Sequence, residues 1–249
     1  MKKLKSLFLV IMSFLLTCLS WEVAAQDFSL MWDINRLSRT NSPTVELKNK
    51  NEHVLKRVPS NRLKTISRVF SDISEVSELN ARLVLIQGDQ PNAFAGPIDN
   101  KNTVGINFAM LDMLESNSSQ WAAVLGHEMA HLKLDHYSAG LQRKIPIKII
   151  SAILRAKTNH YETIRDSEIV MKLIDTKFSR DQERQSDYLG AIWSVESGYN
   201  VWGAVHAHEK LRSHNKSITI PFLRSHPTGR ERVKTLTELA ERLSGSGVD

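Results

Sequence analysis

The sequence contains only one cysteine, Cys18, and this residue lies in an apolar run near the N-terminus. If the N-terminal segment is removed, the remaining chain has no thiol, which excludes a disulfide framework and a cysteine nucleophile. Cysteine is then excluded as a metal ligand as well. A metal bound to this chain would therefore be held by histidine and carboxylate side chains.

The chain also lacks a dense tract of basic residues interleaved with aromatic ones. Its formal net charge is +6, but part of this excess lies in the N-terminal segment and the rest is spread out. Proteins that bind nucleic acid gather basic residues on one face or helix, so we predict no nucleic-acid binding. With 41% hydrophobic residues, the chain has the composition of a globular domain.

The apolar run near the N-terminus, Leu7–Leu19, is short for a transmembrane helix, because it has about 13 residues where a span needs about 20. Lys2, Lys3 and Lys5 precede it, and Val23-Ala24-Ala25 follows as a small-residue cleavage site. This order is typical of a secretory signal peptide, which we predict at residues 1–25. The expected location of the mature chain is the periplasm.

Cys18 leaves an alternative open for the N-terminus, because a lipidated cysteine would attach the chain to a membrane. Thr17 is unfavourable directly before a lipidated cysteine, and Cys18 lies inside the apolar run. We therefore favour a cleaved signal over a lipoprotein. Peripheral association with the membrane or with outer-membrane assembly proteins remains an alternative, and the oligomeric state is not predicted.

The segment His127-Glu128-Met129-Ala130-His131 is a complete H-E-x-x-H motif. In a helix the two histidines lie on one face, where both imidazoles can bind one Zn²⁺. Glu128 projects beside them, where a metal-activated water would lie. The alternative is a surface helix with two solvated histidines. The apolar lead-in from Trp121 to Leu125 favours a buried helix, and a buried histidine pair needs a partner such as a metal.

A catalytic zinc site needs a third protein ligand and leaves one position open for water. His136 is unsuitable because it lies about 180° from His127 around the same helix, so we expect it at the helix end or on the surface. Glu183 and Asp187 form a better pair. They lie one helical turn apart, which would let Glu183 bind the metal while Asp187 orients a ligand histidine.

Three ordered segments of the chain, residues 127–131, 179–187 and 225–232, resemble the motifs of metallopeptidase family 48, a family of gluzincins. Further upstream, Pro91–Ala95 is similar to the P-N-A-F-A segment of that family. The resemblance covers roughly residues 75–235. Four motifs in the family's order make coincidence an unsatisfactory explanation.

The resemblance implies roles for individual residues. The implied ligands of one Zn²⁺ per chain are His127, His131 and Glu183. Glu128 would be the general base. His226 would be a nearby histidine that can approach the metal or stabilise the transition state, and Arg232 matches the arginine that follows the His-Pro pair. Either residue could donate to the oxyanion of the transition state.

The family has an edge strand beside the active site, and Thr103–Phe108 falls at that position. Such a strand could hold an extended polypeptide by adding it to the sheet. The family's Gly-Gly turn between these elements is replaced here by a different turn-rich segment, residues 96–102. This departure changes the expected shape of the substrate groove but not the zinc site.

We predict an α+β fold, a mostly helical zincin-like metalloprotease domain with a small β-sheet whose edge strand borders the active site. The expected divisions are a signal peptide at 1–25, an N-terminal helical wrap at 26–75 and the metalloprotease domain at 76–249. Short strands are expected at Arg82–Gln87 and Thr103–Phe108, paired with each other. The sequence has no internal repeats, so no helical-repeat domain is expected.

Three further segments have the pattern of helices. Apolar residues at helical spacing predict core-facing stripes along Leu63–Val76 and Val233–Leu243. A third segment, residues 145–154, is dense in apolar residues but is interrupted by Pro146 and Lys148. Its short length favours a buried helix over a membrane span, and its position between the ligand helices predicts a lid or groove wall.

The motifs predict a zinc-dependent endopeptidase, and the family resemblance implies that it hydrolyses peptide bonds of unfolded or misassembled cell-envelope proteins. Water activated by the metal would be the nucleophile, with Glu128 as general base. Two alternatives stay open. One is a catalytically quiet zinc-binding protein with a chaperone-like role, and the other is a latent enzyme whose His226 loop occupies the open metal position. Manganese or cobalt could occupy a site with the same ligands.

Overall fold

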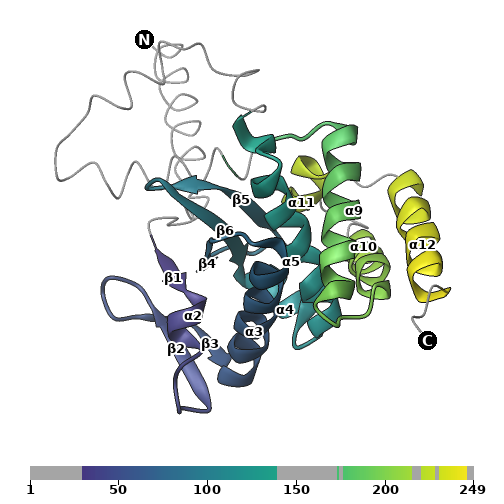
Figure 1. Cartoon of the computed structure of the whole chain (residues 1–249). Coiled ribbons are helices and arrows are strands. Elements are labelled where there is room, and N and C mark those ends of the chain that lie inside the picture. The colour runs from purple at the N-terminus through teal and green to yellow at the C-terminus, as the bar shows by residue number, and fades with distance from the viewer. Residues whose placement is uncertain (1–29, 139–172, 174–175, 215–219, 228–229, 246–249) are drawn as a thin grey trace, which may run out of the picture.

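The computed structural model describes residues 30–138, 173, 176–214, 220–227 and 230–245. The predicted signal peptide at 1–25 and the predicted lid helix at 145–154 lie outside these residues. A small sheet lies beside a group of helices, with a separate β-hairpin at the N-terminal side (Figure 1). This arrangement confirms the predicted α+β, mostly helical zincin-like class.

The described elements keep the labels of Figure 1. The strands are β1 (Met31–Asp33), β2 (Thr44–Lys48), β3 (Val54–Pro59), β4 (Arg82–Ile86), β5 (Ala93–Ile98) and β6 (Lys101–Asn107). The helices are α2 (Ile34–Leu37), α3 (Ser60–Ser77), α4 (Phe108–Leu114), α5 (Ser118–Lys133), α9 (Arg180–Glu196), α10 (Trp202–His214), α11 (Pro221–Ser225) and α12 (Arg230–Gly245).

The larger sheet has the strand order β1-β4-β6-β5. The predicted pairing of Arg82–Gln87 with Thr103–Phe108 is confirmed, since β4 and β6 pair in parallel. The predicted edge position of Thr103–Phe108 is wrong, because β6 lies between β4 and β5. Among the described strands the edge next to β6 is β5. β5 contains part of the P-N-A-F-A segment. An extended polypeptide could add to the sheet by pairing with this edge strand.

The turn between β5 and β6 is tighter than the turn-rich segment 96–102 that the sequence predicts. Gly96, Pro97 and Ile98 pair with β6, which leaves Asp99 and Asn100 as the central turn residues. Both have positive φ, 50° and 58°. Asp and Asn tolerate this left-handed conformation, and two such residues in succession match the twist of a two-residue hairpin.

The N-terminal helical wrap predicted at 26–75 is wrong for most of its described part. β1 pairs with β4 in the larger sheet, and β2 and β3 form a hairpin of their own. Only α3 is a long helix, and its apolar stripe is buried in the core as predicted. The predicted boundary at residue 75 falls inside α3, so it does not separate two domains.

The two helices that form the metal centre, α5 and α9, pack at very close range. Gly126 and Gly190 face each other, and a Cβ atom added at Gly190 would lie only 2.7 Å from the backbone nitrogen of His127. Glycine at these positions therefore lets two helix backbones approach. The final helix α12 buries Leu236 and Leu239, in agreement with the predicted stripe.

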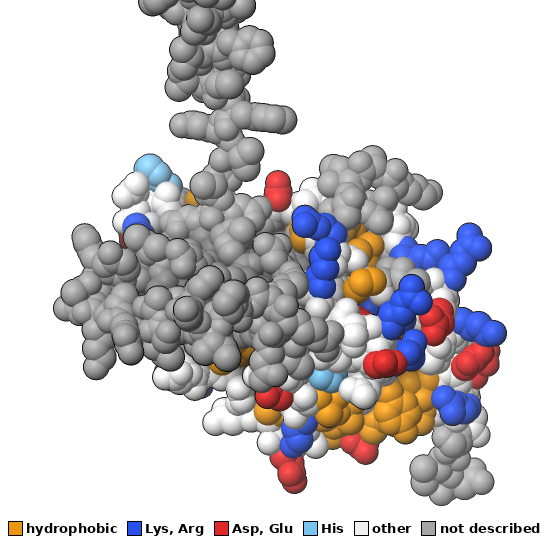
Figure 2. Space-filling model, turned by 90° about the horizontal axis from the view of Figure 1, so that it is seen from above, with side chains coloured by type: hydrophobic (Ala, Val, Ile, Leu, Met, Phe, Trp, Pro, Cys, Tyr) orange, Lys and Arg blue, Asp and Glu red, His pale blue; other side chains and the backbone are white. Residues whose placement is uncertain are grey.

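No helix among the described residues is both long enough and apolar enough to cross a lipid bilayer. On the face seen in Figure 2, basic and acidic side chains are interspersed beside a patch of hydrophobic ones. The basic side chains visible there thus have acidic neighbours rather than forming a field of one sign.

Candidate metal centre

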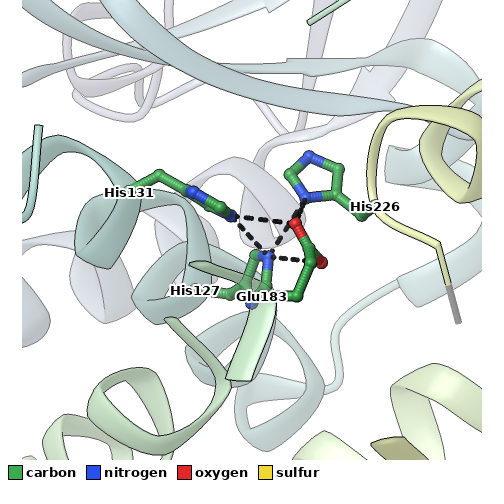
Figure 3. A group of neighbouring side chains, drawn as sticks. All are labelled: His127, His131, Glu183 and His226. Carbon is green, nitrogen blue, oxygen red and sulfur yellow. Dashed lines mark hydrogen bonds and ion pairs between the residues drawn. The ribbon is translucent and has the colours of Figure 1, made fainter. Parts of the chain in front are cut away.

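Four potential metal ligands from three parts of the chain converge in the interior. His127 and His131 project from α5, Glu183 comes from α9, and His226 follows α11 directly (Figure 3). One ligand atom from each residue lies within 4.8 Å of the others, and all four side chains are buried. The sequence therefore identified each member of this group.

Side-chain caps begin both ligand helices, and in α9 the cap lies close to the ligand. Asn117 caps α5 by accepting from the backbone N–H of Gln120. Ser179 and Gln182 form a capping box at the start of α9, in which each side chain accepts from the backbone N–H of the other residue. The box places Glu183 in the first turn of α9, where the free N–H groups and the helix dipole favour a carboxylate.

Asp187 orients His127 from the side away from the ligand cluster. The Nδ1 atom of His127 lies 3.0 Å from Oδ1 of Asp187. Because an ionised carboxylate only accepts, Nδ1 carries the proton and donates. The Nε2 atom of His127 then presents its lone pair to the cluster, as a metal ligand must.

Arg232 fixes both acidic residues of the centre. Its Nε and Nη2 atoms donate to the two oxygens of Asp187, each at 2.7 Å. Nη1 donates to Glu183 and to the backbone oxygen of Pro227. Burial alone would raise the pKa of Asp187, but the nearby guanidinium and the donated hydrogen bonds hold that pKa well below its usual range. All three nitrogens of the guanidinium are engaged, so the geometry gives Arg232 a positioning role.

The atoms that face the centre of the cluster are imidazole nitrogens and carboxylate oxygens. The Nε2 atoms of His127 and His131 are 3.0 Å apart, and Oε1 of Glu183 lies 3.4 Å from that of His131. With its proton on Nδ1, His127 directs a lone pair into this buried space. Neutral imidazole nitrogen and carboxylate oxygen are the atoms that bind zinc in proteins. This donor set fits a divalent metal ion.

Glu128 lies beside the cluster with no hydrogen-bond partner among the described residues. Its side chain is fully buried, and neither carboxylate oxygen accepts a hydrogen bond. Burial raises the pKa of Glu128 to about 7, an effect that His226 partly opposes. A carboxylate with free acceptor positions and a pKa near neutrality is suited to take a proton from water and return it.

His226 belongs to the ligand group as closely as the predicted ligands do. Its Nδ1 atom lies 3.1 Å from Oε1 of Glu183 and 3.2 Å from Nε2 of His127. Its Nε2 atom lies 3.4 Å from Oε1 of Glu128. Burial by itself would lower the pKa of His226, but the carboxylates of Glu183 and Glu128 outweigh it and raise that pKa.

His136 lies just beyond the end of α5, as one of the two expected positions has it, but it is not on the surface. α5 ends at Lys133, and Asp135 has a φ of 50°, so the chain turns and carries His136 back into the interior. His136 is buried, and its Nδ1 atom lies 3.0 Å from Nδ1 of His131. Its rejection as a metal ligand agrees with the structure, because it is not one of the four converging residues.

Two further residues border the site and were not predicted. The ring of Phe178 stacks on His131 with the ring centroids 3.8 Å apart. His208 on α10 lies with Nε2 3.8 Å from Oδ1 of Asp187. Neither belongs to a motif, and each reaches the site only through folding. The one available signal is that Phe178 directly precedes the Ser179 cap of the Glu183 helix.

The α+β fold and the buried group of histidine and carboxylate ligands around an H-E-x-x-H helix define a zincin-like metallopeptidase. The model of peptidase family M48 matches residues 59–240. This chain therefore belongs to peptidase family M48.

Three characterised proteins are similar to this chain. Mitochondrial metalloendopeptidase OMA1 of Arabidopsis thaliana is 23% identical over 172 residues, which cover 69% of this chain and 34% of that protein. Metalloprotease LoiP of Escherichia coli is 23% identical over 75% of this chain and 71% of its own. Metalloprotease YcaL of the same bacterium is 26% identical over 54% of each. The matched region thus spans only about a third of OMA1 and half of YcaL.

Proposed function

We propose that this chain is a zinc endopeptidase that uses Glu128 as its general base. The observation that carries the proposal is the buried carboxylate of Glu128, without a hydrogen-bond partner among the described residues, beside His127, His131 and Glu183. A purely structural metal site has no use for an unpartnered acid next to its ligands. The names of the relatives, two metalloproteases and a metalloendopeptidase, support the same activity.

Each residue of the site has a definite task in peptide hydrolysis. A bound Zn²⁺ supplies a Lewis acid that polarises the scissile carbonyl and acidifies water. Glu128 accepts a proton from the attacking water and returns it to the departing amine. Asp187 and Arg232 keep His127 and Glu183 in place, so that the ligand atoms converge before substrate arrives.

The decisive experiment is digestion of an unfolded protein, casein, by the zinc-loaded chain and its Glu128→Gln variant. We expect the variant to lose about 10²–10⁴-fold in kcat/KM, because it keeps the shape of the side chain but removes the base. Zinc content must be equal in both proteins. Glu196→Gln, which changes an exposed glutamate at the end of α9, is the matched control and retains full activity. Equal cleavage by wild type and Glu128→Gln contradicts the mechanism.

A latent form of the same enzyme is the second candidate, and the position of His226 supports it. Nδ1 of His226 is as close to His127 and Glu183 as those ligands are to each other. Four protein ligands close a metal site, whereas catalysis needs one open position. In that case His226→Ala increases the turnover of casein while leaving the zinc content unchanged. A fall in turnover instead indicates that His226 assists the reaction and that the site is not latent.

The proposed substrates are unfolded or misassembled proteins of the cell envelope, reached through secretion to the periplasm. The lysines, apolar run and small residues within 1–25 support export, and the edge strand β5 suits a substrate in extended conformation. N-terminal sequencing of the exported chain tests the first point, with Gln26 expected as the first residue. A mature chain that begins at Cys18 would support the lipoprotein alternative instead.

A further inference from the structure

His136 is a buried histidine that neither belongs to the ligand group nor has a role in the proposed reaction. It follows the turn at the end of α5 and is buried against the outer side of His131. His131 presents Nε2 to the cluster, so its proton must be on Nδ1 when it binds a metal. That N–H faces Nδ1 of His136 at 3.0 Å, and the distance is a normal hydrogen bond.

The remaining contacts fix the proton of His136 as well. Since Nδ1 of His136 accepts from His131, its proton must lie on Nε2, which is 3.0 Å from Oε1 of Gln185. A glutamine carbonyl oxygen accepts hydrogen bonds. The donor and acceptor roles are therefore consistent in both hydrogen bonds, from His131 to His136 and from His136 to Gln185. Ser186 adds a hydroxyl 3.4 Å from Nδ1, and Gln182 donates to the backbone oxygen of His136 at 3.4 Å. Three side chains of α9 thus hold His136.

We propose that His136 is a positioning residue that orients His131 for metal binding, and that Gln185 orients His136. The chain of hydrogen bonds runs from Nδ1 of His131 through the imidazole of His136 to the amide of Gln185. It links the two ligand helices, because His131 lies on α5 and Gln185 lies two residues after the ligand Glu183 on α9.

The two ligand histidines are therefore oriented by partners of different charge. His127 donates to the carboxylate of Asp187, which Arg232 neutralises in turn. His131 donates to a neutral imidazole that ends on a neutral amide. A hydrogen bond to Nδ1 orients each ring, and the partner of His127 is charged whereas that of His131 is neutral. The fixed partners of ligand histidines commonly account for about 10–100-fold in metal affinity.

The test measures the zinc dissociation constant of the full chain by competition with a colorimetric chelator. His136→Phe keeps a planar ring but offers no acceptor, and we expect zinc binding to weaken about 10–100-fold. His136→Asn places its Oδ1 near the position of Nδ1 and should restore most of the affinity. Gln185→Ala, a change at an exposed side chain, should weaken binding by a smaller factor. His206→Phe removes an exposed histidine from α10 and is the control, with unchanged affinity expected.

Affinity unchanged in His136→Phe overturns the proposal, and so does His136→Asn binding as weakly as the Phe variant. Thermal unfolding of the zinc-free proteins shows whether each variant is folded. If His136→Phe does not fold, Gln185→Ala decides, and an unchanged dissociation constant in that variant overturns the proposal. The inference rests on the proposed zinc site, so a wild-type chain that binds no zinc refutes the proposed function itself. Variants that bind zinc as tightly as wild type refute only the role of His136.

Discussion

At Arg232, one guanidinium group forms ion pairs with two buried carboxylates, those of Asp187 and Glu183. Both acids are almost inaccessible to solvent, so each would be costly to bury as an anion without this partner. The same side chain therefore supports the folded state and the shape of the metal centre. Loss of its charge should affect stability and metal binding together.

Arg232→Gln should lower the free energy of unfolding of the zinc-free chain by about 3–5 kcal/mol at neutral pH, because it leaves two buried anions without their cation. Although burial opposes it, the guanidinium of Arg232 holds the pKa of Asp187 well below its ordinary value of 3.8, so the ionised form of Asp187 stabilises wild type above this value. That stabilisation is lost as the pH falls. The difference between wild type and variant should therefore shrink below about pH 4 in urea titrations.

Arg184→Gln provides the matched control for this charge effect. Arg184 also pairs with two acids, Asp181 and Glu231, but its side chain is 42% exposed. Exposed ion pairs contribute about 0–1 kcal/mol, so this variant should unfold almost as wild type does. Equal destabilisation by both substitutions would mean that burial does not govern the importance of Arg232.

Helix geometry together with the family resemblance predicted the candidate ligand residues. His127 and His131 lie one turn apart, and Glu183 and Asp187 do the same on α9, so each pair could be recognised by its spacing. His136 could not be predicted in the same way. Its position depends on the turn at Asp135 and on Gln185, 49 residues further along the chain. Hydrogen bonds between distant segments leave no periodic pattern in the sequence.

At the scale of the elements, the distance between α5 and α9 determines whether the ligands meet. The backbones approach at Gly126 and Gly190, directly beside His127. An added methyl group at Gly190 would meet backbone atoms, which cannot move aside as a flexible side chain can. The helices must then separate, and Glu183 moves away from the histidines with them.

Gly190→Ala should therefore destabilise the chain by about 1–3 kcal/mol and also weaken zinc binding. Gly245→Ala, at the end of α12, is the control, because no atom of the described residues lies within 4 Å of a Cβ atom added there. Urea unfolding and chelator competition on both variants measure the two effects. Full zinc affinity in Gly190→Ala would show that the close approach of the helices is not needed for the site.

The sequence predicted the order of strands less well than it predicted the helices. Residues 44–48 alternate in polarity, which is the pattern of a half-buried strand, whereas residues 54–59 do not, and neither strand is part of a helical wrap. The edge position of β6 was inferred from the family resemblance. Its residues from Thr103 to Asn107 are all buried, as in a strand covered on both faces and flanked on both sides. Burial on both faces depends on packing partners, which local pattern does not specify.

For the whole molecule, the metal centre joins segments that are far apart in sequence. His127 and His226 are separated by 99 positions, with Glu183 between them. A metal held by such residues binds the folded chain and has much lower affinity for the unfolded one, so its binding free energy adds to stability. The proposed zinc ion should thus stabilise the fold in addition to its catalytic role.

We expect free zinc at 100 times its dissociation constant to raise the free energy of unfolding by about 2.7 kcal/mol. Urea unfolding with buffered zinc, and again after chelation, measures this difference. Glu183→Gln is the control, since it removes the only ligand on α9 among the four converging residues and should lose most of the zinc-dependent stabilisation. If zinc stabilises Glu183→Gln as much as wild type, the ion binds elsewhere and does not link α5 to α9.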